Sequence, residues 1–354
     1  MEDDRNTRRA VDHEARGGVA HVLDHTFGLS PPMALPQPTP LLVLALLAAN
    51  SSREAPPRAP RADRMTGMTG PDVRTDPFLG TVVHVVGHRQ TRPNLPTNTD
   101  VAGCPFCPGG LEAPEPYDVR WFPNRWPAMP GDRCEVVLYS PDHDATIPSL
   151  GAAGMRKVVD LWAERTTALG RRDDVAFVLV FENRGASVGA TISHPHGQIY
   201  AYDHVPDRPR RLFASDWRPA ATASERRVVA NSSWLCDVPF ASEFPLALSI
   251  APTAQVGDLP SLDSRQRDEL ATMLVDVFDR LDRLFDEPLP YMMWINQRPF
   301  DGTLRDAWLS IDIVSPWRQR QLPRFIAAAE IGAGEYFNPV VPEDVAARLR
   351  DLSR

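Results

Sequence analysis

The stretch Glu135-Val-Val-Leu-Tyr-Ser-Pro141, followed by the turn Ile147-Pro-Ser-Leu150, decides the fold because the chain contains a second copy of it. The second copy reads Pro245-Leu-Ala-Leu-Ser-Ile-Ala-Pro252 and then Leu259-Pro-Ser-Leu262. In both copies a run of strand-forming residues leads through a Pro-Ser-Leu turn to an amphipathic helix. Self-similarity at a fixed spacing indicates repeated architecture, so the sequence predicts two related halves.

The helix that follows each turn carries an apolar stripe with helical spacing. The first stripe contains Met155, Val158, Val159, Trp162 and Leu169, and the second contains Leu270, Met273, Leu274, Val277, Leu281 and Leu284. Each helix leads to two β-rich segments, 176–182 and 197–202 in the first half and 291–296 and 308–314 in the second. The expected fold class is α+β, with duplicated halves in which a helix packs on an antiparallel sheet. The strands of the two halves can join into one larger sheet.

Residues 1–70 differ in composition from the rest, because charged residues are mixed with two proline-rich stretches. Such a segment cannot bury a core, so we expect a disordered N-terminal extension. The remaining boundaries are 71–215 for an N-terminal catalytic half and 216–354 for a C-terminal half. The second half lacks catalytic histidines, since it has Trp308-Leu-Ser-Ile-Asp312 where the first half has His194-Pro-His-Gly-Gln198.

The composition argues against several classes of protein. A net charge of −8 argues against a nucleic-acid-binding protein, which normally has a basic face. The longest apolar run, Leu41 to Ala49, is less than half of the roughly 20 residues that a membrane-spanning helix needs. Acidic residues such as Asp3 and Asp12 precede this run, which argues against a signal peptide. We therefore expect no nucleic-acid partner, no membrane partner and a cytoplasmic location.

Cys104-Pro-Phe-Cys107 has the spacing with which two thiolates bind one tetrahedral metal ion. A redox pair is expected at the start of a helix, but the neighbouring proline and glycine residues indicate a loop. Two buried cysteines without a metal are the remaining alternative. His143 and His194 can complete the ligand set of a closed, structural zinc site. The alternative for His143 is an ordinary exposed loop histidine.

His196 lies two residues after His194, so in an extended strand both side chains point to the same face. A metal at His194 would hold His196 rigidly beside it, and a neutral imidazole in a fixed position is a good nucleophile toward phosphorus. Gly197 allows a phosphate to approach the backbone, and the amide of Gln198 can donate to a phosphate oxygen. These residues predict a nucleotidyl-histidine intermediate. The alternative is a structural histidine.

Four motifs follow one another in the chain, namely Cys104-x-x-Cys107, Ser140-Pro-Asp-His143, Phe181-Glu-Asn-Arg-Gly185 and His194-Pro-His-Gly-Gln198. This ordered set resembles the galactose-1-phosphate uridylyltransferase family of the histidine-triad superfamily, over residues 74–350. The resemblance implies duplicated histidine-triad-like halves. It also implies an enzyme of galactose metabolism, a UDP-glucose–hexose-1-phosphate uridylyltransferase. Members exchange UMP between UDP-glucose and galactose 1-phosphate by a ping-pong route through a uridylylated histidine.

The resemblance also implies roles for individual residues. His196 is implied as the nucleophile, and Gln198 as the partner of the transferred phosphoryl group. The ligands of one structural zinc ion are matched by Cys104, Cys107, His143 and His194. The implied substrate contacts are Arg89, Arg92, Asn124, Asn183, Thr191 and Gln198 and, near the C-terminus, Arg324, Phe325 and Glu330. The last three resemble a segment that closes the sugar site, often across a homodimer.

The chain departs from the family pattern at several positions. Many members bind a second metal with histidines of the second half. The matching positions here are Asn296, Ile311 and Ile313, so no second metal site is expected. Arg125 stands where the family often has an acidic residue, and segment 335–339 lacks the usual glutamine. Uridylyl transfer remains the expected chemistry, while the sugar 1-phosphate stays open.

Other functions are compatible with the same motifs. An adenylyltransferase or dinucleotide phosphorylase can share the fold, as can a uridylyltransferase for another sugar 1-phosphate. Adenylyl relatives often have serine where this chain has Gly197, which favours uridylyl transfer. A zinc-stabilised nucleotide-binding module without turnover would lack the nucleophile, whereas His196 is present.

Overall fold

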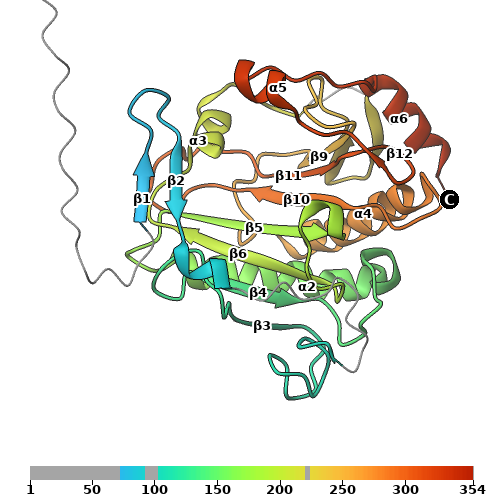
Figure 1. Cartoon of the computed structure of the whole chain (residues 1–354). Helices are drawn as coiled ribbons and strands as arrows, with labels where there is room; N and C mark the ends of the chain where they lie inside the picture. Colours follow the sequence, from blue (N-terminus) through green and yellow to red (C-terminus); the bar gives the residue numbers. More distant parts are fainter. Residues whose placement is uncertain (1–71, 92–102, 220–223, 354) are drawn as a thin grey trace, which may run out of the picture. The chain divides into compact units, whose positions relative to one another are not determined.

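A nine-stranded sheet organises the computed structural model, which describes residues 72–91, 103–219 and 224–353 (Figure 1). All neighbouring strands of this sheet are antiparallel. In the order of pairing they are β3 (Arg120–Pro123), β4 (Cys134–Leu138), β6 (His196–Tyr202), β5 (Phe177–Arg184), β10 (Tyr291–Asn296), β11 (Ser310–Ser315), β9 (Leu246–Pro252), β8 (Trp234–Asp237) and β7 (Arg227–Ala230). The expectations for residues 1–70 and for Arg92 fall outside the described residues.

Helices and two small hairpins complete the structure. The helices are α2 (Ile147–Gly170), α3 (Asp207–Ala214), α4 (Ser264–Arg283), α5 (Ala328–Ala333) and α6 (Pro342–Asp351), with short 3-10 turns η1 (Gly87–Thr91) and η3 (Ala186–Val188). The hairpins are β1 (Asp72–Thr75) with β2 (Val82–Val85), and β12 (Trp317–Gln319) with β13 (Leu322–Pro323). Within the described part of the chain, no helix is long and apolar enough to cross a membrane.

The sheet confirms the predicted duplication. Counted toward the centre, the first half contributes β4, β6 and β5, and the second contributes β9, β11 and β10 in the same arrangement. The halves join where β5 pairs with β10, with Phe181 opposite Trp294. Helices α2 and α4 pack against each other, and an ion pair of 3.0 Å joins Arg267 of α4 to Asp160 of α2. The two halves therefore share one continuous sheet and one helical layer.

The predicted stripes are buried in the core between the sheet and α2 and α4, except that Leu284 is half-buried at the end of α4. Helix α2 begins at Ile147, inside the segment predicted as a turn, because Thr146 and Ser149 form a capping box at its start. Strand β11 begins at Ser310 rather than at residue 308. The reason is that the Leu309 amide donates to the carbonyl of Val256, outside the sheet ladder, at 2.8 Å.

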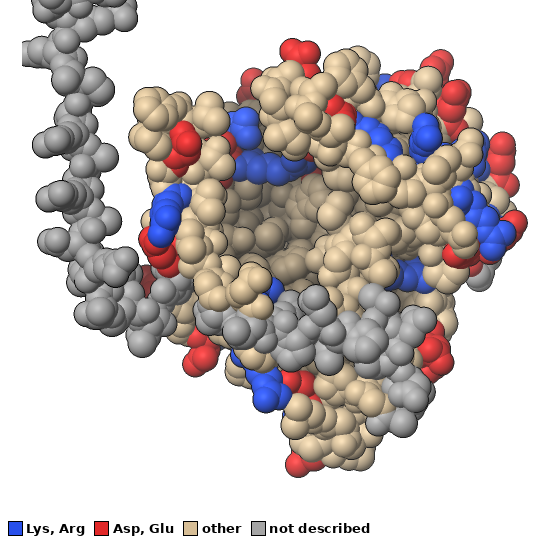
Figure 2. Space-filling view, viewed as in Figure 1, with Lys and Arg blue, Asp and Glu red and all other residues tan. Residues whose placement is uncertain are grey.

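Alternation along β6 places the functional side chains on the face opposite α2 and α4. Gly197, Ile199 and Ala201 are buried toward the helices, whereas His196 and Gln198 are half-buried on the open face. Figure 2 shows a hollow on this face, over the middle strands of the sheet, with basic side chains along one rim. The fold thus exposes one side of the His-Pro-His-Gly-Gln strand to a concave surface.

Candidate functional site

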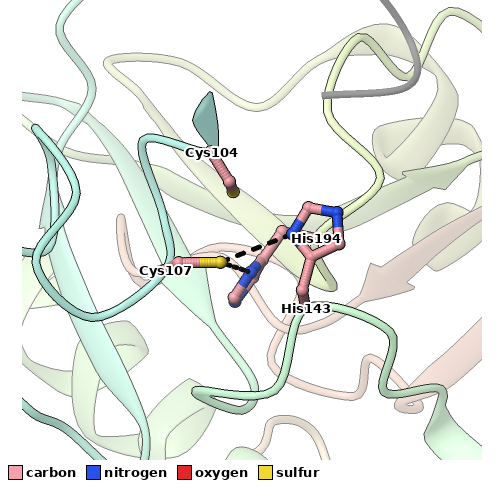
Figure 3. A group of neighbouring side chains, drawn as sticks. All are labelled: Cys104, Cys107, His143 and His194. Atoms are coloured by element: carbon pink, nitrogen blue, oxygen red, sulfur yellow. Dashed lines mark hydrogen bonds between the residues drawn. The ribbon is translucent and has the colours of Figure 1, made fainter. Parts of the chain in front are cut away.

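Two cysteines and two histidines from three separate segments meet beside β6 (Figure 3). Cys104 and Cys107 lie in the loop before β3, His143 follows β4, and His194 precedes β6. All four side chains are buried, and their ligand atoms lie within 4.8 Å of one another. The structure therefore brings together the complete ligand set that the sequence predicts, and this cluster could hold a metal ion.

The distances in the cluster fit a tetrahedral ion. The Cys107 Sγ atom lies 3.4 Å from His143 Nδ1 and 3.5 Å from His194 Nδ1. A tetrahedral zinc ion with Zn–S of about 2.3 Å and Zn–N of about 2.05 Å separates sulfur and nitrogen by roughly 3.6 Å. His194 Nε2 donates to the carbonyl of Ser140 at 2.8 Å, which directs the lone pair of Nδ1 at the cluster.

The pKa values of the cluster residues favour binding of a cation. Burial and the neighbouring Cys104 raise the pKa of the Cys107 thiol to about 11, so a thiolate here needs a positive partner. Burial lowers the pKa of His194, which keeps its imidazole neutral and able to act as a ligand. Gly110 closes the cysteine loop, because a side chain there would overlap the carbonyl oxygens of Cys104 and Pro105.

His196 begins β6 and is oriented by its own strand. Its Nδ1 lies 2.8 Å from the carbonyl oxygen of His194, which fixes the tautomer with the lone pair on Nε2. The ring of Phe106, from the cysteine loop, packs edge-on against His196 with ring centroids 5.0 Å apart. The imidazole is therefore held from two sides, as a nucleophile requires.

A cavity of about 520 Å³ opens beside His196 on the side of β3 and β4. Gln198 and Asn124 both line it, and the Asn124 amide donates to Gln198 Oε1 at 3.3 Å. This contact occupies Gln198 Oε1 and leaves its amide nitrogen available as a donor. The cavity also contains Glu112 and Arg125, whose charged groups lie 3.8 Å apart. Its size suits a nucleotide.

The other predicted contacts of the first half are distributed around His196. Asn183 lines a second cavity, of about 280 Å³, that also reaches His196 and His194. Thr191 is half-buried in the connection between β5 and β6. Arg89 lies in η1, near Cys134 of β4. Burial raises the pKa of the Cys134 thiol, and the positive charge of Arg89 opposes this rise. His196 thus stands between two cavities.

The three C-terminal residues do not join this site within the same chain. Arg324 forms an ion pair with Glu330 and donates to the carbonyl of Glu243 at 2.7 Å, in the connection between β8 and β9. Three strands, β5, β10 and β11, lie between β6 and β9 in the sheet order. The side chain of Phe325 is exposed. Arg324, Phe325 and Glu330 therefore lie on the opposite half of the molecule.

In the second half, polar residues of β10 and β11 occupy the place where many family members bind a second metal. Asn296 faces Ser310 and Asp312, and its amide donates to them at 3.0 and 2.8 Å. Ile311 and Ile313, the positions inferred from sequence, point to the other face and belong to the core. The correction follows from strand alternation, since a slip of one residue exchanges the two faces of a strand. This set offers one carboxylate and neutral groups bonded to each other, which does not fit a metal.

Sequence reasoning missed three aromatic residues that support the site. Phe106 packs on His196, and the hydroxyl of Tyr117 lies 2.9 Å from His194 Nε2. Tyr139 follows β4 and lies beneath Gly197, where an added side chain would overlap its hydroxyl. Phe106 stands between the two cysteines of the motif, which was an available signal. No sequence signal distinguished Tyr117 and Tyr139 from ordinary core residues.

Family models match most of the described chain. Residues 125–206 match the model for the N-terminal domain of galactose-1-phosphate uridyl transferase, and residues 192–354 match the model for its C-terminal domain. The chain belongs to the galactose-1-phosphate uridylyltransferase family. This finding confirms the resemblance inferred from the ordered motifs.

Individual members of the family match along nearly their whole length. The galactose-1-phosphate uridylyltransferase of Thermotoga maritima is 33% identical over 314 residues, which cover 79% of this chain and 98% of the relative. That of Streptomyces lividans is 33% identical over 316 residues, covering 81% and 88%. A solved uridylyltransferase superposes with a TM-score of 0.69 at 28% identity, covering 79% of this chain and 97% of that one. An ADP-glucose phosphorylase from Arabidopsis thaliana, with a TM-score of 0.61 at 24% identity over 80% of this chain and all of that one, shows the same fold.

Proposed function

We propose that this member of the family is an enzyme that exchanges UMP between UDP-glucose and galactose 1-phosphate, through a uridylyl group carried on His196. The observation that carries the proposal is the fixed tautomer of His196 beside Gln198 and the nucleotide-sized cavity. Nε2 attacks the α-phosphorus of UDP-glucose, a P–N bond forms, and the P–O bond to glucose 1-phosphate breaks. A phosphate oxygen of galactose 1-phosphate then attacks the same phosphorus, and the P–N bond breaks to give UDP-galactose.

The residues of the first half bind and orient the substrate in this proposal. Gln198 donates to the phosphoryl oxygen that gains charge, and Asn124 orients Gln198 and faces the uridine. Asn183 and Thr191 contact the phosphates from the other side of His196. Arg89, together with Arg92, which is outside the described residues, neutralises phosphate charge. The C-terminal half, 216–354, completes the sheet and the helical layer without contributing a nucleophile.

We assign the metal of the Cys104, Cys107, His143 and His194 cluster as one structural Zn²⁺. Two thiolates and two imidazoles in a tetrahedral set are ligands typical of zinc. With four protein ligands no position is open to substrate, so the ion supplies rigidity and no chemistry. His194 then fixes the start of β6, and the cysteine loop presses Phe106 against His196.

The proposed reaction is tested by following products with paired donors and acceptors. UDP-glucose with galactose 1-phosphate is expected to give UDP-galactose and glucose 1-phosphate, while the other hexose 1-phosphates define acceptor specificity. ADP-glucose with inorganic phosphate tests the alternative, since a phosphorylase would release ADP. Turnover of the adenylyl pair and not of the uridylyl pair would contradict the proposal, and turnover of neither would indicate a binding module.

Replacing Gln198 should slow the chemical step more than it weakens binding. One preorganised donor to charge that develops in the transition state is worth about 10²–10³ in rate, so Gln198→Ala should lose that factor in single-turnover rate. Gln198→His places a titratable ring beside the adduct, which can activate water. Hydrolysis of UDP-glucose should then rise relative to transfer. The idea fails if Gln198→Ala keeps the wild-type rate at saturating UDP-glucose.

A homodimer would bring Arg324, Phe325 and Glu330 to the site of a second copy. Within one chain these residues cannot line the cavity beside His196, because they lie on the opposite half of the sheet. The segment that carries them exposes apolar side chains, namely Phe325, Ile331, Tyr336 and Phe337. Exposed apolar surface of this kind is typical of a protein interface. We therefore place the hexose between two subunits.

Hybrid dimers test this arrangement. Phe325→Ser should lower transfer by roughly tenfold or more, the effect of losing an aromatic contact worth at least about 1.4 kcal/mol. In a hybrid of Phe325→Ser and His196→Ala subunits, one site has His196 from the first chain and Phe325 from the second. Activity should therefore exceed that of either parent dimer. A hybrid that is no more active than its parents would show that each chain completes its own site.

We place the enzyme in the cytoplasm. All four cysteines are buried and unbridged, and cysteines without disulfides are typical of proteins in a reducing compartment. Phosphorylated sugars and nucleotide sugars are charged and accumulate inside the cell. Cell fractionation followed by detection of the protein tests this location.

A further inference from the structure

The segment Pro195–Gly197 rests on the residues that follow β4. The Tyr139 amide donates to the carbonyl of Pro195 at 3.3 Å, between the metal-cluster histidine and the nucleophile. The Tyr139 hydroxyl lies directly under Gly197, so close that a side chain at this position would overlap it. Tyr139 therefore touches the His-Pro-His-Gly segment twice, once through its backbone and once through its ring.

A buried carboxyl group lies beside the Tyr139 hydroxyl. Glu182 of β5 is 4% exposed, and the Tyr291 hydroxyl donates to its Oε1 at 2.5 Å. The Tyr139 hydroxyl faces both Glu182 and Trp162. Three buried polar atoms here form no hydrogen bond of good geometry, namely Glu182 Oε2, Tyr139 Oη and Trp162 Nε1. Burying a polar group without a hydrogen bond costs free energy of folding, so three such groups at one place need an explanation.

The surroundings of Glu182 do not explain it as an ion pair. The nearest cation, Arg184 of β5, is bonded to Asp282 of α4 at 3.0 Å. The other groups that face Glu182 are the neutral hydroxyls of Tyr139, after β4, and Tyr291, of β10, while Trp162 of α2 faces the Tyr139 hydroxyl. A carboxyl that keeps its proton can donate from Oε2 to the Tyr139 hydroxyl while Oε1 accepts from Tyr291. This bonding pattern pairs two of the three atoms.

We propose that Glu182 is a positioning residue for the nucleophile, because it fixes the ring of Tyr139 and thereby the segment Pro195–Gly197 that carries His196. This inference rests on the function proposed above. By strand alternation the side chain of Asn183, the next residue of β5, points to the opposite face of the sheet, and both Glu182 and Asn183 line the cavity that reaches His196. The same short stretch of β5 therefore contributes to the support of His196 and to the cavity beside it.

Matched variants separate this role from general stability. Glu182→Leu removes the polar contact, Glu182→Gln keeps a neutral donor, and Asp312→Asn is the control, since Asp312 is a buried acid of the second half bonded to Asn296 and Ser249. Displacing a reacting group by about 1 Å can cost 10²-fold in rate. The single-turnover rate of the Glu182→Leu variant should fall roughly ten- to hundredfold at saturating UDP-glucose, with little change in the half-saturating concentration. Glu182→Gln should restore most of this rate, and Asp312→Asn should leave it unchanged.

The pH dependence of stability provides a second readout. Burial raises the pKa of Glu182 from its ordinary 4.5 to about 7, against the opposing effects of the two tyrosine hydroxyls and Arg184. The folded protein thus holds this proton more tightly than the unfolded chain. The stability it contributes is fully present below about pH 4.5 and is lost as the pH rises through about 7. The fall in melting temperature across this window should be smaller in the Glu182→Gln variant than in the wild type.

A second pair of variants, Gly197→Ala alone and combined with Tyr139→Phe, tests the contact between Tyr139 and Gly197 if Glu182→Leu does not fold. Gly197→Ala should reduce the single-turnover rate because the new methyl group displaces Tyr139, and adding Tyr139→Phe should recover part of it by removing the hydroxyl. The inference is overturned if Glu182→Leu folds and reacts like Asp312→Asn, or if Tyr139→Phe gives no recovery in the Gly197→Ala background. If the wild type itself forms no uridylyl adduct, the proposed function fails instead.

Discussion

His196→Ala is expected to abolish uridylyl transfer while the fold and the metal content stay unchanged. Deleting a covalent nucleophile in a well-studied hydrolase costs of the order of 10⁶-fold in rate, and a loss of that size is expected here. The His-Pro-His motif contains one other histidine, His194, and its Nδ1 faces the metal cluster. His194 therefore cannot replace His196 as the nucleophile. Steady-state transfer, metal analysis and circular dichroism together measure the effect.

His204→Ala is the matched control for this variant. His204 follows the same strand, is half-buried and bonds to Asp203 at 2.7 Å. Its removal should leave transfer near the wild-type rate. Substantial transfer by His196→Ala, or an equal loss in His204→Ala, would contradict the assignment of the nucleophile.

Cys104→Ala is expected to release the metal and to destabilise the protein strongly. Structural zinc sites contribute about 10–16 kcal/mol of apparent binding energy in small zinc domains, and part of such energy is expected to stabilise this fold. A loss of 3–5 kcal/mol would lower the melting temperature by about 10 °C. Adduct formation should also slow, because the cysteine loop holds Phe106 against His196. Metal content and thermal unfolding are the measurements.

Cys236→Ala controls for the loss of a buried thiol. Cys236 is fully buried in the core of the second half, on β8, away from the metal cluster. Its replacement should lower the melting temperature modestly without loss of metal. Zinc content that stays unchanged in Cys104→Ala would remove Cys104 from the ligand set.

The fold was predictable where the repeat and the periodicities were strong. Strand β10 has the bounds that the sequence predicts, and the stripes on α2 and α4 are buried, because apolar spacing alone determines which side of a helix meets the sheet. Helix α2 was harder to delimit, since Thr146 caps it before Pro148 and Gly151 bends its first turn with φ of 63°. Local capping decided that boundary, and periodicity does not report it.

The cluster of Cys104, Cys107, His143 and His194 was predictable because the residue types and their spacing are those of a metal site, while the role of His196 as nucleophile stays a prediction. The positions of Ser310 and Asp312 were not predicted correctly. Aligning strand β11 with the family pattern one residue out of register exchanges a side chain of the open face for a core side chain such as Ile311. The place of Phe325 was not predictable either, because it depends on packing between segments far apart in sequence. Tyr139 and Glu182 resemble core residues until the approach of Gly197 is seen.

Mapping the covalent adduct on the wild-type protein shows which residue carries the uridylyl group. The protein is incubated with UDP-glucose without acceptor, digested under conditions that preserve phosphoramidates, and analysed by mass spectrometry. The account predicts one uridylyl group on the peptide that contains His196, which disappears when galactose 1-phosphate is added and UDP-galactose forms. An adduct on another residue, an adenylyl adduct from ADP-glucose in its place, or transfer without any adduct would contradict it.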